Sequence, residues 1–189
     1  MTFTEIKNYL LSITGQYNIE VLDIDDNIIN QIVNRALSTY SQYKPLITYK
    51  KINIPNSPYK ISTIENYTII DIDSLYLANP TKFFNAPKLD YVKYNKTSKE
   101  LYTVLTGSYW ARVWLVRKLD DITNDDYEFF DLVQAYFLIA IGTNRSNFVI
   151  NDLPFTTNAD DLKSAGKELL DNTIENLKNT DQYWWEAIN

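Results

Sequence analysis

Residues 28–61 read IINQIVNRALSTYSQYKPLITYKKINIPNSPYKI, and the spacing of their apolar residues changes halfway along. Up to Tyr40 these residues recur at helical intervals, which predicts an amphipathic helix that starts at Asp25 and Asp26. Pro45 has no amide proton and disfavours helical geometry in the residue before it, so we expect the helix to end there.

The residues after Pro45 have the pattern of a β-ribbon. Apolar and polar residues alternate over 47–54, which predicts a strand. Turn-forming residues fill Pro55–Pro58, and a second short strand pattern covers 58–62. We therefore predict a β-hairpin over Ile47–Ser62, which the chain enters directly from the helix.

Strand patterns dominate the middle of the chain, and helical patterns dominate its ends. Helical spacing predicts two helices within residues 3–43, separated by a link over Tyr17–Asp23. We leave Asp73–Pro87 irregular, because this segment is ambiguous between a strand and a helical turn. β-Branched and aromatic residues between turn residues predict six strands, at 47–54, 58–62, 67–72, 89–94, 101–106 and 109–118.

Two further helices are predicted after the strands, over 125–142 and over 158–178 with Asn158 as its cap. In the first of them, apolar residues occupy nearly all sides of the helix itself, which indicates a central buried helix. Any part of it that one subunit leaves uncovered should be covered by a neighbour. The second helix has a single apolar stripe, so it should lie on the outside.

These patterns predict a single α+β domain of residues 1–189. Its helical bundle is formed by both chain ends, residues 1–45 and 120–189. Its β-rich insertion, with the hairpin and further antiparallel strands, spans residues 46–119.

The composition excludes several kinds of chemistry. The chain has neither cysteine nor histidine, so thiol nucleophiles, disulfides, thiolate metal sites and histidine bases are excluded. The four glycines are too scattered for a phosphate-binding loop. We expect no enzyme activity, no cofactor and no metal. With 18 basic and 24 acidic side chains the net charge is -6, which gives no general drive to bind a phosphate backbone.

No targeting or membrane signal is evident, so we expect a soluble protein that does not interact with a membrane. The segment MTFTEIKNYLLSITG has the spacing of an amphipathic helix and lacks a basic region before an apolar run. The longest apolar run, Phe137–Ile141, is far shorter than the roughly 20 residues that span a bilayer.

The helix that ends in Ala36-Leu37-x-x-Tyr40-Ser41-x-Tyr43-x-Pro45 and enters a β-ribbon resembles the adaptor proteins in the necks of tailed bacteriophages. The buried helix, the loop Asn151–Phe155 and the amphipathic last helix are similar to the carboxy-terminal half of many neck adaptor and connector subunits. The resemblance covers the greater part of the chain, by pattern rather than by a specific motif.

This resemblance implies a structural virion protein, assembled in the host cytoplasm, that forms a ring of its own copies between the portal and the tail. Its partners would be portal, tail or neck proteins, and genomic DNA would pass through the lumen without specific binding. The β-rich middle departs from the smallest all-helical adaptors. It could instead indicate a tail-completion or baseplate subunit.

Aromatic residues supply most of the candidate interface. In the strand 109–118 the alternation places Trp110, Arg112 and Trp114 on one face, and Trp with Arg is typical of interface hot spots. Both tryptophans could equally be ordinary core residues. The apolar terminus after the last helix should fold back or dock onto a partner. The complete set of candidate interface residues is Ile47, Tyr49, Lys51, Pro55, Pro58, Tyr59, Trp110, Arg112, Trp114, Tyr183, Trp184 and Trp185.

Two groups of acidic residues, and the aromatic residues, leave two other function classes open. Asp23, Asp25, Asp26, Asp71 and Asp73 could bind a hard cation, and Asp120, Asp121, Asp125, Asp126 and Glu128 could supply paired carboxylates for glycoside hydrolysis. Either group would point to a carboxylate-dependent enzyme, a glycosidase or a metal-dependent nuclease. Helix capping and solvated turns are the simpler explanation for both groups. The tyrosines and tryptophans could also form a carbohydrate-stacking platform.

Overall fold

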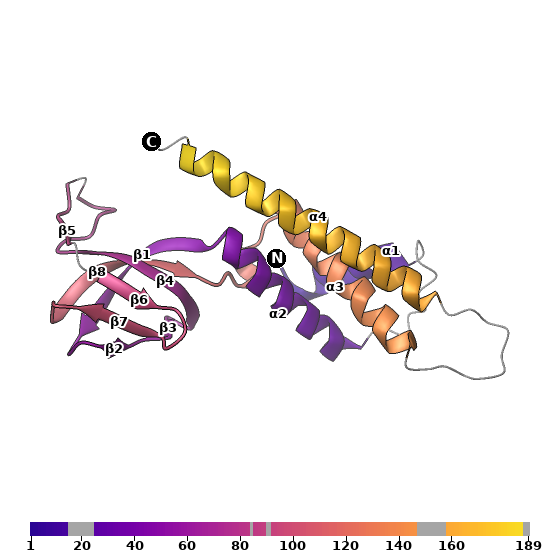
Figure 1. Ribbon diagram of the computed structural model, residues 1–189, viewed down its shortest axis with the longest axis horizontal. Helices are drawn as coiled ribbons and strands as arrows, with labels where there is room; N and C mark the ends of the chain where they lie inside the picture. Colours follow the sequence, from indigo (N-terminus) through magenta and orange to yellow (C-terminus); the bar gives the residue numbers. More distant parts are fainter. Residues whose placement is uncertain (15–24, 84, 90–91, 147–157, 187–189) are drawn as a thin grey trace. The chain divides into compact units, whose positions relative to one another are not determined.

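The computed structural model describes residues 1–14, 25–83, 85–89, 92–146 and 158–186, with 180–186 described as backbone only (Figure 1). The described residues form a mixed α+β structure of four α-helices and antiparallel sheets. They divide into two compact units, Met1–Lys44 with Leu119–Asn189, and Pro45–Lys118. These limits lie one residue from those predicted for the helical and β-rich parts, and the single-domain assignment stays a prediction.

All the α-helices found in the described residues belong to the helical unit. The elements are α1 (Phe3–Thr14), α2 (Asp26–Tyr43), a 3-10 helix η3 (Leu119–Asp121), α3 (Tyr127–Ser146) and α4 (Ala159–Glu186). The predicted link over Tyr17–Asp23 and the predicted loop Asn151–Phe155 lie outside the described residues.

The first two helices have well-defined caps. Thr2 and Glu5 form a reciprocal capping box at the start of α1, in which the Thr2 amide donates to the Glu5 carboxylate over 2.7 Å. Asp25 caps α2, as predicted, by accepting a hydrogen bond from the amide of Asn27. The last hydrogen bond of α2 runs from the Lys44 amide to the Tyr40 carbonyl, and Pro45 then prevents another turn.

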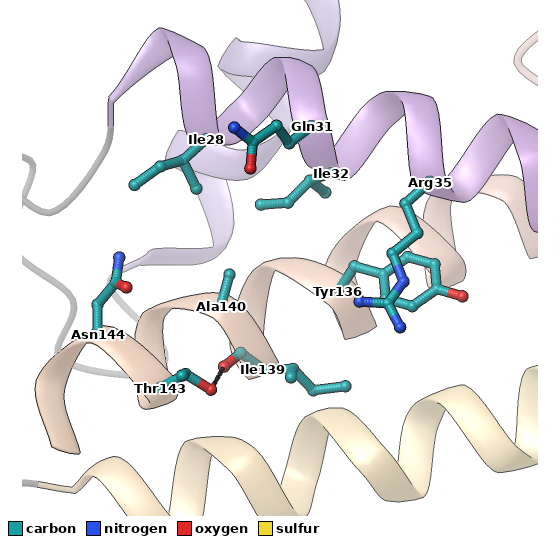
Figure 2. Close-up of a pocket in the computed structure, with 9 residues that line it drawn as sticks. All are labelled: Ile28, Gln31, Ile32, Arg35, Tyr136, Ile139, Ala140, Thr143 and Asn144. Atoms are coloured by element: carbon teal, nitrogen blue, oxygen red, sulfur yellow. Dashed lines mark hydrogen bonds between the residues drawn. The ribbon is translucent and has the colours of Figure 1, made fainter. Parts of the chain in front are cut away.

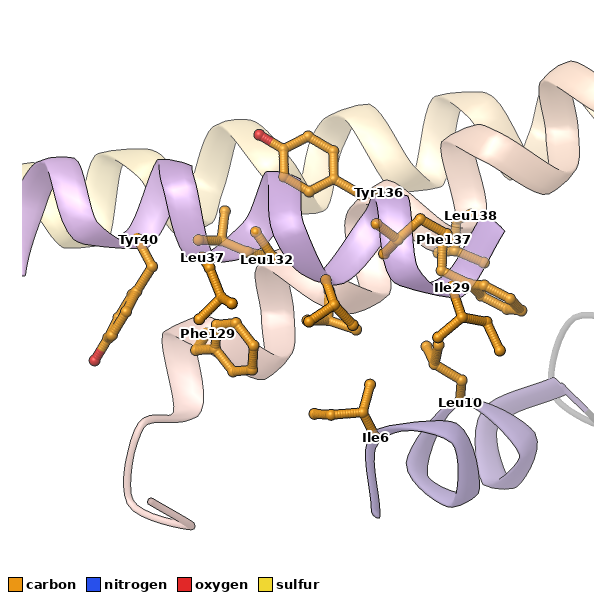
Figure 3. Packing of buried hydrophobic residues seen from close by; sticks show 14 of the residues in the cluster. Ile6, Leu10, Ile29, Leu37, Tyr40, Phe129, Leu132, Tyr136, Phe137 and Leu138 are labelled. Atoms are coloured by element: carbon orange, nitrogen blue, oxygen red, sulfur yellow. The ribbon is translucent and has the colours of Figure 1, made fainter. Parts of the chain in front are cut away.

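The core of the helical unit is formed around α3, where Phe129, Leu132 and Phe137 have no solvent exposure (Figure 3). Ile6 and Leu10 of α1 pack against the same cluster, together with residues of α2 and α4. The prediction of a central buried helix is confirmed. However, Ile139 and Ala140 of α3 are only partly buried, so this coverage is incomplete.

Two glycines let α3 and α4 approach very closely. A Cβ atom on Gly142 would lie 2.6 Å from the carbonyl oxygen of Ala159, and one on Gly166 would lie 2.8 Å from that of Ala135. Both distances are shorter than a real Cβ contact permits. The two helices are therefore packed backbone to backbone over this length, and they run antiparallel.

The β unit consists of two antiparallel sheets whose inner faces share one core. The larger sheet has the order β1-β8-β4-β3, with β5 also paired to β4, and the smaller sheet has the order β2-β7-β6. The strands are β1 (Leu46–Ile54), β2 (Tyr59–Lys60), β3 (Thr63–Ile64), β4 (Tyr67–Tyr76), β5 (Lys88–Leu89), β6 (Val92–Asn95), β7 (Glu100–Thr103) and β8 (Gly107–Leu115).

The predicted hairpin over Ile47–Ser62 is wrong. β1 pairs with β8 over its whole length, whereas β2 pairs with β7 in the other sheet. Residues 55–58 are therefore a crossover from one sheet to the other, which is stabilised where Ser57 accepts a hydrogen bond from the Thr103 amide. The turn residues were recognised correctly, but the turn does not bring its two flanking strands together.

Several predicted limits also change. β4 continues to Tyr76, so part of the segment left irregular is a strand. The helix expected to end at 178 continues to Glu186, because the sequence has no helix-stopping residue there, so Tyr183–Glu186, expected to follow the helix as a tail, are part of it.

Candidate interaction surface

The central strand β8 has one face in the core and one face turned away from it. Ala111, Val113 and Leu115 are fully buried between the two sheets. Trp110, Arg112 and Trp114 alternate with them and retain partial exposure. The predicted two faces of this strand are thus confirmed, and the tryptophans are not ordinary fully buried core residues.

The register of β1 against β8 places six predicted interface residues directly opposite one another. Ile47 is paired with Trp114, Tyr49 with Arg112, and Lys51 with Trp110. Because paired residues of neighbouring strands project to the same side of a sheet, all six lie on the outer face. We call this set the aromatic face.

A carboxylate on the adjacent strand orders the centre of the aromatic face. The indole N–H of Trp114 donates to Oδ2 of Asp73 over 3.0 Å, and Nη1 of Arg112 lies 3.5 Å from the same oxygen. Asp73 is therefore used to orient two large side chains, which is a different role from the metal ligation considered for it.

Two tyrosines, Tyr49 and Tyr76, lie beside Arg112 and Trp110 on the same side of the sheet. The rings of Tyr49 and Tyr76 meet edge to face with centroids 5.6 Å apart. Burial, followed by the neighbouring Tyr76, raises the pKa of the Tyr49 hydroxyl above its ordinary value. Tyr49 therefore stays neutral and can act as a hydrogen-bond donor at physiological pH.

β1 is an edge strand of the larger sheet, because β8 is its only partner among the described residues. Its nine residues consequently have one unpaired edge. Ile47 on this strand is 43% exposed although it is a large apolar residue. Lys51 is also exposed, and no described carboxylate forms an ion pair with it.

The other predicted interface residues do not join the aromatic face. Pro55 and Pro58 lie exposed in the crossover, and Tyr59 of β2 packs against the core between the sheets. Tyr183, Trp184 and Trp185 belong to the last turns of α4, and their side chains lie outside the described part of the chain.

The acidic residues mostly have structural partners. Asp126 accepts hydrogen bonds from the Thr123 amide and the Tyr40 hydroxyl before α3, and Glu128 forms a 2.7 Å ion pair with Lys44. Asp71 pairs with Lys96. Asp23 lies outside the described residues. Within the described ranges, no three acidic side chains are grouped so that they could hold a metal ion.

A groove between α2 and α3, with a volume of about 350 Å³, was missed by the sequence reasoning (Figure 2). Its lining comes from one stripe of each helix: Ile28, Gln31, Ile32, Arg35, Tyr136, Ile139, Ala140, Thr143 and Asn144. No carboxylate contributes to this lining. The incomplete coverage of the α3 pattern was the signal that could have located it.

Arg35 lies at one end of the groove in a fixed position. Its guanidinium carbon is 4.5 Å from the centroid of the Tyr136 ring, and the Tyr136 hydroxyl is held by the Thr39 hydroxyl at 2.8 Å. Among the described residues no carboxylate forms an ion pair with Arg35.

In comparisons with known proteins, no protein-family model and no curated protein matches this chain. None of the described helices is both long and apolar enough to cross a membrane. Two surfaces of the described residues are candidates for binding a partner, the aromatic face with its edge strand and the groove between α2 and α3.

Proposed function

We propose that this chain is a structural protein of a tailed-bacteriophage virion, a neck adaptor that forms an oligomeric ring between the portal and the tail. In this proposal the helices form a bundle, and the bundles of neighbouring copies stand side by side in the ring. The β unit contacts the adjacent ring. DNA passes through the lumen without specific binding, in keeping with the net charge of -6.

The observation that carries the proposal is the unpaired edge of β1 beside the aromatic face. An exposed edge strand is a template for pairing with a strand of another chain. Main-chain pairing supplies affinity, and the side chains next to the edge supply specificity. Here those side chains are Ile47, Tyr49 and Lys51, backed by Trp110 and Trp114.

The same surface would also suit a tail-completion or baseplate subunit, which likewise joins two protein rings. The structural neighbours of the chain in a particle distinguish these locations. In each of them the work is to match two assemblies by contacts, without chemical turnover.

Substitution of Ile47→Asp tests the role of the edge. A carboxylate at this exposed position leaves the core intact but opposes burial against a partner strand. Val104→Asp is the matched control, since Val104 is 83% exposed and lies between β7 and β8, away from the aromatic face. We expect both variants to fold, and only Ile47→Asp to be missing from purified particles. Equal incorporation of the two variants would reject the proposed contact.

A carbohydrate-binding module is the second candidate, favoured by the partial exposure of Trp110 and Trp114 on one face. Stacking of a sugar ring on either indole would quench or shift its fluorescence. A glycan array without hits for the full chain, together with unchanged tryptophan fluorescence, would reject this candidate.

A further inference from the structure

The groove between α2 and α3 has the chemistry of a site for an apolar group that has a carboxylate beside it. Ile28, Ile32 and Ala140 provide an apolar floor between two antiparallel helices. Arg35 presents a guanidinium at one end, already oriented by its contact with Tyr136. Stacked arginines keep their N–H donors free for a planar anion such as a carboxylate.

The groove is also the place where α3 lacks cover. Phe129, Phe137 and Leu138 of this helix are fully buried, whereas Ile139 and Ala140 are not. An interhelical groove with a partly exposed apolar stripe suits an additional helix segment or a few large side chains.

The end of α4 supplies side chains of the required kind. Its last residues read Asp181-Gln182-Tyr183-Trp184-Trp185-Glu186, so three aromatic residues are enclosed by two acidic ones. In the antiparallel packing of α3 and α4, Gly166 lies between Ala135 and Ile139. α4 extends beyond the start of α3 (Figure 1). The glycine contacts place Tyr127, the first residue of α3, level with about residue 176, so α4 continues for about ten more residues, roughly 15 Å.

The terminal residues of α4 are too distant to fill the groove of their own chain. Gly166 lies at the level of Tyr136, and eighteen residues of continuous helix separate it from Trp184. At 1.5 Å per residue this is roughly 27 Å along the axis, directed away from the rest of the groove. A second copy of the chain is therefore the source of the segment.

We propose that the last turns of α4 of one copy dock into the α2–α3 groove of the next copy. Trp184 and Trp185 lie on the apolar floor, and Asp181, which shares their side of the helix at three and four residues' distance, pairs with Arg35. A knob and a groove on different parts of the surface make a head-to-tail contact, which closes into a ring where the rotation between copies permits it. This contact would join neighbouring subunits of the proposed ring. It rests on the proposed function in one respect, that copies of the chain associate with one another.

Single cysteines provide a direct test because the natural chain has none. Full-length Gln31→Cys, which places a thiol in the groove lining, is mixed with full-length Gln182→Cys and oxidised. The control partner is Asn34→Cys, on the same helix and exposed, but outside the lining. We expect a disulfide-linked dimer at least tenfold more abundant for the Gln31 pair than for the Asn34 pair. Equal yields would overturn the proposal.

Two further variants test which groups make the contact. In the background of the Gln31 and Gln182 pair, Arg35→Glu should reduce cross-linking to the control level, whereas Lys167→Glu, with the same change of charge on the exposed side of α4, should not. Replacing Tyr183, Trp184 and Trp185 by serine should have the same effect as Arg35→Glu. Cross-linking that survives either loss would also overturn the assignment.

The outcomes for this contact and for the proposed function are separable. The cross-linking is measured on the isolated chain, whereas the proposed function is tested by incorporation of Ile47→Asp into particles. Loss of cross-linking specificity with the expected particle result removes the groove contact alone. Specific cross-linking together with normal incorporation of Ile47→Asp into particles would reject the neck role and support the contact between copies.

Discussion

Arg35 and Tyr136 are stacked across the gap between α2 and α3, with 4.5 Å between the guanidinium carbon and the ring centroid. The ring is held in place by the hydrogen bond between its hydroxyl and that of Thr39. This pair closes one end of the groove. Tyr136 of α3, held by Thr39 of α2, thus orients the Arg35 guanidinium at the surface of a chain whose net charge is -6.

Tyr136→Phe should remove the hydrogen bond to Thr39 while the ring remains. We expect the free energy of unfolding to fall by about 0.5–1.5 kcal/mol, the usual net value of one such bond. Urea denaturation followed by circular dichroism would measure it. Tyr127→Phe is the control, because Tyr127 is 68% exposed and its hydroxyl has no hydrogen bond among the described residues. A larger loss for the control would contradict this account of Tyr136.

Gly166→Ala should destabilise the helical unit although alanine is the better helix former by about 1 kcal/mol. The added Cβ would lie 2.8 Å from the Ala135 carbonyl oxygen, so α3 and α4 would have to separate. We expect a loss of roughly 1–3 kcal/mol in the free energy of unfolding. Ser164→Ala on the exposed side of α4 should be neutral or stabilising. A stabilised Gly166→Ala variant would show that the close packing is wrong.

The free energy of unfolding of the Asp131→Asn variant, relative to the natural chain, should rise as the pH rises. Burial and then the nearby Glu128 raise the pKa of Asp131 above its ordinary value of 3.8. The folded chain thus holds this proton to a higher pH than the unfolded chain does. Its contribution to stability is greatest below the ordinary value and is lost as the pH rises through the raised pKa.

The measurement is the difference in the free energy of unfolding between Asp131→Asn and the natural chain, taken from pH 4 to pH 8. It should increase in favour of the variant and then remain constant. A difference independent of pH would exclude the stated cause.

Trp114→Phe should loosen the aromatic face by removing the indole donor to Asp73. Asp73 keeps its contact with Arg112, so we expect a modest loss of about 0.5–1.5 kcal/mol in the free energy of unfolding. Trp110→Phe is the control, because it removes the same indole atoms but no hydrogen bond found among the described residues. If both substitutions cost the same, the bond to Asp73 contributes nothing measurable.

Local signals in the sequence were sufficient for the elements and for the faces of β8. Asp25 and Pro45 delimit α2 because capping and the missing proline amide act within a few residues. The alternation around Val113 predicted which side chains enter the core, because side chains of a strand point alternately to its two sides.

Those local signals could not predict which strands pair with each other. A turn at Pro55–Pro58 is compatible with a hairpin and with a crossover between sheets, and the choice depends on β8, which lies more than fifty residues further along the chain. The groove was missed for a related reason. Ile28 and Ile139 each look like core residues on their own helix, and only the packing of the two helices leaves them partly uncovered.

The most direct test of the account is cryo-electron microscopy of tailed particles from the phage whose genome would encode this chain. We expect a ring of density between portal and tail into which both units fit, with a strand of the adjacent ring beside β1. Particles with a complete neck in which no density fits this chain would contradict the proposed function.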